Sequence, residues 1–312
     1  MTGISYGIAF FVFEVIIYFS ASYFVYIKAF KSKKDYSDGP LALPGSSVLK
    51  ITTERMLTLI NDINETPHED IEIISFDGTR LFGRYYHISD GAPVIIQFHG
   101  YKSRACRDCS GTFRIAKDLG LNILVVDQRA HGKSGGRTIS FGIKERYDCL
   151  FWTKYIEERF GKEKKILLLG LSMGAATVIM ASELELPEGV VGVIADSAYT
   201  SPRDILMKVG SQMHYPKKLM EYFLTSGAFI FGRFDIDGAD CIKAVKNTKL
   251  PVLFLHGRDD YFVPCEMSRK VFSSCLCDKS IFIFENGGHC AGYIFNTERY
   301  IGAINGFCEK VL

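Results

Sequence analysis

The chain has 312 residues, of which 47% are hydrophobic and 23% are charged, and this composition excludes an intrinsically disordered or fibrous protein. Its 37 Lys and Arg nearly balance 35 Asp and Glu, leaving a formal net charge of +2. The chain therefore lacks the basic excess with which proteins neutralise phosphates, and we expect no nucleic-acid partner. The length fits one large α/β domain or two ordinary domains.

The chain begins with an apolar stretch over residues 4–26, in which Glu14 is the only charge. As a helix this stretch would extend about 35 Å, which is enough to cross a bilayer. Nothing basic precedes it, and Tyr and Phe continue to its end, so we expect an uncleaved anchor rather than a signal peptide. Four lysines at positions 28–34 predict, by the positive-inside rule, that the rest of the chain is cytoplasmic. A buried or interfacial helical hairpin is the alternative.

The chain is expected to divide into three parts. Residues 1–34 form the single-pass transmembrane anchor with its basic flank, and residues 35–70 form a linker and a leading helix. Within this second part, the Gly and Pro residues between Lys34 and Ser47 are typical of a linker. Residues 71–312 form one α/β domain.

From Ile71 onward, short apolar runs alternate with helical patterns, which predicts a mostly parallel sheet covered by helices on both faces. Asp77-Gly78 between the first two runs predicts an antiparallel hairpin at the start of the sheet. Helical spacing is present over residues 143–155, and a last helix is expected over residues 291–311. The eight expected strands are Ile71–Phe76, Leu81–Ile88, Val94–Phe98, Asn122–Val126, Lys165–Leu169, Val190–Ala195, Val252–Leu255 and Ser280–Phe284.

Nine scattered cysteines, an odd number, do not form a disulfide framework. Cys106 and Cys109 make a CxxC motif, which leaves a metal or redox site as an alternative. No second CxxC or close His pair completes a zinc site. We therefore expect reduced thiols, no metal and no cofactor.

The fifth expected strand runs directly into Gly170–Gly174, which reads GLSMG and is followed by a helical pattern. This is G-x-S-x-G in its strand-turn-helix setting. Glycine on either side of Ser172 lets chain segments pass closely around a tight turn, which displays the hydroxyl at the edge of the sheet. The Met173 amide then lies at a helix N-terminus, where it can hold an oxyanion.

A serine nucleophile needs a base and an acid that orients the base. After a serine on such a turn, the acid and then the histidine follow in the chain. His289 lies in a glycine-rich loop just past the last expected strand, and we assign it as the base. The residues themselves leave Asp259, Asp260 and Asp196 open as the acid.

From about residue 70 to its end, the chain resembles the α/β-hydrolase fold family. Relatives carry H-G-x-x-D-x-x-V-P after the seventh strand, and the matching segment at 256–264 reads HGRDDYFVP. The resemblance places the acid at Asp260 and implies that Asp196 is structural or lines the pocket.

Two further segments match the same family. The segment at 97–101, QFHGY, resembles the loop whose amide completes the oxyanion hole, which implies the backbone N–H of Tyr101 as the second donor beside Met173. The segment at 127–136, DQRAHGKSGG, resembles the family's D-x-R-G-H-G-x-S-x-G stretch, with Ala130 at a usual glycine. This match implies structural roles for Arg129 and His131.

The long connection at about 197–250 is rich in Met, Phe and Tyr and predicts a small helical cap that suits an acyl chain or aromatic ester. The resemblance, closest to esterase and acylaminoacyl-peptidase-like hydrolases, implies a membrane-anchored serine hydrolase. We expect it to cleave carboxylic esters through Ser172, His289 and Asp260. The alternatives are a serine peptidase or amidase that acts on short peptides, an inactive binding module on the same fold, and a structural membrane scaffold.

Overall fold

A computed structural model describes residues 2–33, 47–212 and 216–312. One eight-stranded sheet with strand order β1-β2-β4-β3-β5-β6-β7-β8 forms its centre. β1 pairs antiparallel with β2, β2 pairs antiparallel with β4, and the other neighbours are parallel. The strands are β1 (Glu69–Ile74), β2 (Arg80–Tyr86), β3 (Val94–Phe98), β4 (Asn122–Asp127), β5 (Ile166–Leu171), β6 (Val190–Asp196), β7 (Val252–Gly257) and β8 (Lys279–Phe284).

All eight expected strands and the opening hairpin are confirmed, and no strand end is shifted by more than two residues. The expected linker between Lys34 and Ser47 falls almost entirely outside the described residues. The helices are α1 (Thr2–Ala29), α2 (Ser47–Glu65), α3 (Ala105–Asp108), α4 (Ser110–Asp118), α5 (Glu145–Phe160), α6 (Met173–Ala181), α7 (Pro202–Gln212), α8 (Lys217–Ser226), the π-helical segment η1 (Gly227–Gly232), α9 (Cys241–Asn247), α10 (Cys265–Ser274), α11 (Gly292–Phe295) and α12 (Thr297–Val311).

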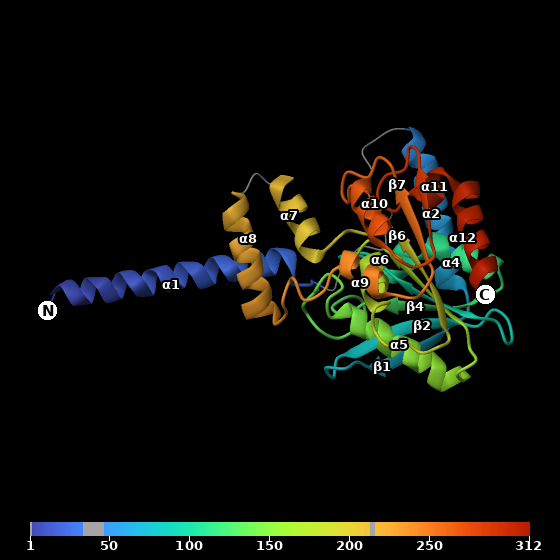
Figure 1. The fold of residues 1–312 in the computed structure, drawn as a ribbon, viewed down its shortest axis with the longest axis horizontal. Coiled ribbons are helices and arrows are strands. Elements are labelled where there is room, and N and C mark those ends of the chain that lie inside the picture. The colour runs from blue at the N-terminus through green and yellow to red at the C-terminus, as the bar shows by residue number, and fades with distance from the viewer. Residues whose placement is uncertain (1, 34–46, 213–215) are drawn as a thin grey trace.

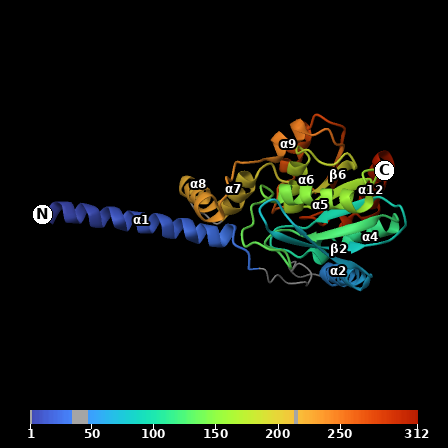
Figure 2. The same cartoon turned by 90° about the horizontal axis from the view of Figure 1, so that it is seen from below.

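Alternate residues of the central strands face two separate hydrophobic clusters, as the period-2 geometry of a strand requires. On β5, Ile166 and Leu168 pack into the cluster with α5, α6 and α9. Leu167 and Leu169 pack into the cluster with α4 and α12. The sheet is therefore covered on both faces, and Figures 1 and 2 show these layers.

The expected last helix over residues 291–311 is wrong in one respect, because it is broken at Asn296. Asn296 has a non-helical φ of −134°, and its side-chain amide donates to the Glu285 carbonyl 2.9 Å away. A short amide side chain competes readily with helical backbone bonding. The break follows from this contact with a residue 11 positions earlier in the chain.

α1 projects from the rest of the molecule as one long helix, and only its C-terminal part meets the body (Figures 1 and 2). Its segment Tyr6–Ala29 is long and apolar enough to cross a membrane. The outer side chains are exposed, as for Phe10 at 63% and Phe11 at 65%. By contrast, Phe30, directly after the helix, is fully buried against the rings of Phe141 and Phe234.

Candidate active site

Ser172 occupies a strained turn between β5 and α6. Its φ of 54° and ψ of −110° are unusual for a residue with a side chain. The two glycines of the motif are sterically required, because a Cβ at Gly170 would lie 2.1 Å from the Gly174 carbonyl oxygen, and a Cβ at Gly174 would lie 2.0 Å from the Phe98 carbonyl oxygen. The close approach of these segments pushes the Ser172 side chain outward at the carboxyl end of the sheet.

The structure brings together the three side chains singled out in the sequence. His289 Nε2 lies 2.8 Å from Ser172 Oγ. Its other ring nitrogen, Nδ1, lies 2.6 Å from Asp260 Oδ2. A histidine that donates Nδ1–H to the carboxylate presents an unprotonated Nε2 to the serine hydroxyl. The geometry therefore suits proton transfer from Ser172 to His289.

Asp260 is held in its ionised form by hydrogen bonds to both of its oxygens. The backbone N–H groups of Phe262 and Val263 donate to Oδ1 at 2.9 and 2.8 Å. Burial would raise the pKa of Asp260, but the hydrogen bonds with His256 and His289 outweigh burial and hold this pKa well below its usual range. A carboxylate that stays charged can orient His289 and stabilise the imidazolium form.

The two other aspartates left open by the sequence lie in different surroundings. Asp259 is exposed and contributes its backbone N–H to a 3.0 Å bond with the Gly287 carbonyl. Asp196 is buried, accepts hydrogen bonds from Ser197 and Tyr300, and has a pKa raised by burial. The structure thus brings Asp260, and neither of these two, to His289.

Two backbone segments lie next to Ser172. α6 begins at Met173, so its N–H belongs to a first helical turn, whose amides have no intrahelical acceptor. The loop after β3 passes on the other side, where a Cβ at Gly100 would lie 3.5 Å from Ser172 Cβ. Tyr101 follows directly, so its backbone segment lies beside the serine.

His131 and Asp108 support this loop, and sequence reasoning missed their contacts with it. The Lys102 N–H donates to His131 Nε2 at 3.0 Å, and the Gly100 N–H donates to Asp108 Oδ2 at 2.9 Å. Burial lowers the pKa of His131 to about 3, which keeps Nε2 free to accept. No local pattern reveals these bonds, because each joins a residue of the loop to a residue of another segment.

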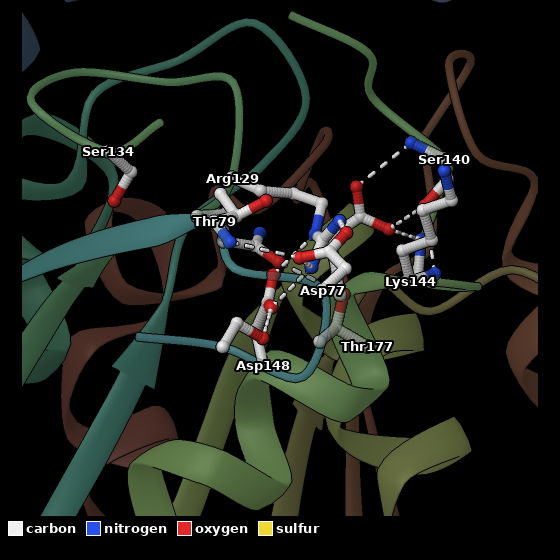
Figure 3. A network of polar contacts seen from close by, with 12 residues as sticks. Asp77, Thr79, Arg129, Ser134, Ser140, Lys144, Asp148 and Thr177 are labelled. Carbon is white, nitrogen blue, oxygen red and sulfur yellow. Dashed lines mark hydrogen bonds and ion pairs between the residues drawn. The ribbon is translucent and has the colours of Figure 1, made fainter. Parts of the chain in front are cut away.

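Arg129, just after β4, lies between two carboxylates that come from two other segments of the chain (Figure 3). Its guanidinium donates to both oxygens of Asp148 on α5 at 2.6 Å and to Asp77 Oδ2 at 2.8 Å. A bidentate pair of this kind fixes orientation as well as charge. This network anchors the loop after β4 and lies outside the contacts of Ser172. Cys106 and Cys109, in the α3–α4 segment, form no disulfide with another described cysteine.

A cavity of about 540 Å³ opens onto Ser172 and Met173. Its walls come from α7, α8 and, beyond what sequence reasoning anticipated, the C-terminal part of α1. The lining side chains are mostly aliphatic and aromatic, with Lys28 as the charged one among the described lining residues. Such a cavity favours an apolar group next to the serine.

Comparisons with known proteins agree with this fold. The sequence model of the serine aminopeptidase S33 family matches residues 91–227, which include Ser172. The esterase Pf2001 of Pyrococcus furiosus superposes with a TM-score of 0.66 and 20% identity, over 89% of this chain and 99% of that chain. Est1E of Butyrivibrio proteoclasticus, with bound ferulic acid, superposes with a TM-score of 0.60 and 18% identity, over 77% and 98% of the two chains.

Two curated relatives match more than half of this chain at low sequence identity. YqkD of Bacillus subtilis is 24% identical over 233 residues, which cover 72% of this chain and 75% of that protein. The lysophosphatidylserine lipase ABHD12 of Danio rerio is 25% identical over 197 residues, which cover 61% of this chain and 49% of the lipase. Together with the strand order, these similarities show that the chain has the α/β-hydrolase fold.

Proposed function

We propose that the protein is a membrane-anchored serine hydrolase that cleaves carboxylic esters through an acyl-enzyme intermediate. The observation that carries the proposal is the continuous series of contacts from Asp260 through His289 to Ser172 Oγ. Each link has the length of a hydrogen bond, and the order of the groups is that of acid, base and nucleophile.

The reaction follows from these positions. Ser172 Oγ attacks the acyl carbonyl while His289 Nε2 takes its proton, and the amides of Met173 and Tyr101 stabilise the oxyanion. His289 then returns the proton to the leaving alcohol, and the acyl group remains on Ser172. Water attacks this ester by the same route and releases the acid. Each oxyanion amide contributes roughly 3–4 kcal/mol to lowering the barrier.

α1 serves in this proposal as an uncleaved single-pass anchor. Tyr26 and Phe30 at its end belong to the hydrophobic core of the domain, so removal of the segment as a leader would expose that core. The lysines at positions 28–34 support a cytoplasmic location for the hydrolase domain, because basic residues favour the cytoplasmic side of a membrane helix.

The test is labelling of the full chain with a fluorophosphonate probe, which reacts with activated serines. Labelling should occur in the wild type and in Ser273→Ala, a surface serine variant in α10, and should vanish in Ser172→Ala. Labelling that persists in Ser172→Ala would refute the nucleophile assignment. If the wild type hydrolyses esters faster than a variant with alanine at Ser172, Asp260 and His289, the protein is not an inactive binding module.

A peptidase is the second candidate, because the matching family model describes a serine aminopeptidase. An aminopeptidase needs a carboxylate to hold the substrate's ammonium group. The described residues that line the cavity include no Asp or Glu, which favours the esterase. Comparison of p-nitrophenyl acyl esters with aminoacyl anilides separates the two, and higher kcat/KM on the anilides would reverse the preference.

A further inference from the structure

The C-terminal part of α1 is built into the domain. The Tyr18 hydroxyl donates to Ser226 Oγ on α8 at 2.8 Å, and the Tyr26 hydroxyl lies 2.8 Å from Thr138 Oγ1. The backbone of α1 passes so close to η1 that a Cβ at Gly227 would lie 2.9 Å from the Ser22 carbonyl oxygen. This end of α1 therefore has one defined position against the cap helices.

One face of this end of α1 forms a wall of the cavity at Ser172. The lining residues of α1 are Ala21, Phe24, Val25, Lys28 and Ala29, whose spacing places them along a single stripe of the helix. Across the cavity lie Ile205 and Leu206 of α7 and Met220 and Phe223 of α8. An apolar chain that reaches Ser172 would therefore lie between α1 and these two helices.

If α1 is the proposed anchor, this wall falls at the boundary of the bilayer. A hydrocarbon core of about 30 Å takes up about 20 helical residues, so a span that starts at Tyr6 ends near Val25, inside the lining stripe. Leu219 and Tyr222 on α8 and Phe229 on η1 are 52%, 56% and 70% exposed. Both of these elements contact α1, and Figure 1 shows α8 beside the C-terminal half of α1. Apolar and tyrosine side chains of this kind favour a membrane interface.

The end of α1 is also joined to the loop beside Ser172. The Tyr101 hydroxyl donates to the Ala29 carbonyl at 2.6 Å, and Lys102 Nζ donates to the Lys28 carbonyl at 2.9 Å. The position of the helix and the position of the proposed oxyanion loop are therefore fixed together.

We propose that α1 is a substrate-binding element as well as an anchor, and that the substrate is a long-chain acyl ester that enters from the bilayer along α1. The acyl chain lies between α1 and α7–α8 with its ester at Ser172. The volume of about 540 Å³ lies within the range of roughly 300–1,000 Å³ that encloses one ligand of this size. This inference rests on the proposed function and deepens it by naming the substrate class.

The first experiment narrows the cavity by placing a larger side chain on its α1 wall. The full chain in lipid vesicles is assayed on p-nitrophenyl palmitate and p-nitrophenyl butyrate. Val25→Trp should lower kcat/KM for palmitate at least tenfold more than for butyrate, because only the long chain needs the space beside α1. Ile27→Trp, on a position of α1 outside the lining, should leave the ratio of the two substrates within twofold of wild type.

Two results would overturn the proposal. Equal losses on both esters would mean that the position affects the whole domain, and an unchanged ratio would mean that the chain lies elsewhere. Ala21→Trp carries the same expectation and covers the case in which Val25→Trp does not fold.

The second experiment does not require turnover. A palmitoyl lysophospholipid with a diazirine at the chain end is incorporated into vesicles holding the full-length Ser172→Ala protein, and crosslinks are mapped by mass spectrometry. Crosslinks should concentrate on residues 18–29 and on α7 or α8. Crosslinks confined to other parts of the chain, or only to the outer half of α1, would overturn the acyl site. Failure of the proposed function would appear in a different measurement: the wild type would hydrolyse esters no faster than Ser172→Ala. The crosslinking result does not depend on turnover, so the two failures can be told apart.

Discussion

At the scale of single residues, the adjacent residues Asp259 and Asp260 have the same side chain but very different surroundings. Both follow β7, and their side chains are chemically identical. One is exposed, whereas the other is buried and lies 2.6 Å from His289 Nδ1. Residue type and spacing alone left them open, and the family resemblance pointed to Asp260. The contact with His289 supports the same choice.

Asp260→Asn should lower kcat on a p-nitrophenyl ester by roughly 10³–10⁴-fold, because the amide cannot hold His289 in the tautomer that accepts the serine proton. Asp259→Asn is the matched control and should change kcat less than threefold. Steady-state kinetics of the two variants measure both effects. A large loss in Asp259→Asn with little loss in Asp260→Asn would reverse the assignment.

His131 gives a pH dependence of stability. Burial lowers its pKa from the ordinary 6.5 to about 3, so the unfolded chain binds a proton between these values that the folded protein does not. The free energy of unfolding should therefore fall as the pH falls from 7 toward 4, by at most about 1.4 kcal/mol per pH unit from this group. Chemical unfolding of the detergent-solubilised chain at several pH values measures this dependence. The free energy of unfolding should change less steeply with pH in His131→Asn than in the wild type. Equal slopes in the two proteins would contradict the assignment of the pH dependence to His131.

At the scale of elements, the strands were predictable because the apolar residues of each strand form a local pattern in the sequence. Apolar runs bounded by turn residues mark the central strands, which are buried on both faces. All eight expected strands were found, with small errors at their ends. The break at Asn296 was not predictable, because it depends on a hydrogen bond to Glu285 across the fold. Cap helices α7 and α8 lie in a segment whose sequence predicted helices but not the wall they form with α1.

The turn at Ser172 provides the prediction at this scale. Gly174→Ala places a Cβ 2.0 Å from the Phe98 carbonyl oxygen, so α6 must move away from β3. We expect the free energy of unfolding to fall by roughly 3 kcal/mol and fluorophosphonate labelling of Ser172 to be lost.

The control for this variant is Gly302→Ala in α12, where a Cβ meets nothing within 4 Å. It should raise the free energy of unfolding by about 0.5–1 kcal/mol, because alanine favours helix over glycine. Similar effects of the two substitutions would show that the close packing of the turn is unimportant.

At the scale of the whole molecule, α1 combines a long exposed apolar half with an end that packs beside the cavity at Ser172. The large apolar side chains of the first half are exposed up to Ile17, and the second half lines the cavity at Ser172. A membrane protein of this form would hold its active site at a fixed, short distance from the bilayer.

Deletion of residues 2–17 removes most of the span and keeps the packed end of α1. The truncated chain should leave the membrane fraction on alkaline carbonate extraction, whereas the full chain should remain in it. Hydrolysis of p-nitrophenyl butyrate should persist in the truncated chain, because Tyr18 to Phe30 still contact the body. Retention of the truncated chain in the membrane fraction would show that other surfaces anchor the protein.

The sequence by itself determined the alternation of strands and helices, the turn at Ser172 and the helix of membrane-spanning length. Each of these features depends on a local pattern of apolar residues, glycines and turn residues. Tertiary structure decided which aspartate meets His289, how His131 supports the loop beside Ser172, and that α1 lines the cavity. Those features join segments far apart in the chain, and a contact between two such segments depends on the packing of the whole sheet and its helices rather than on any local spacing.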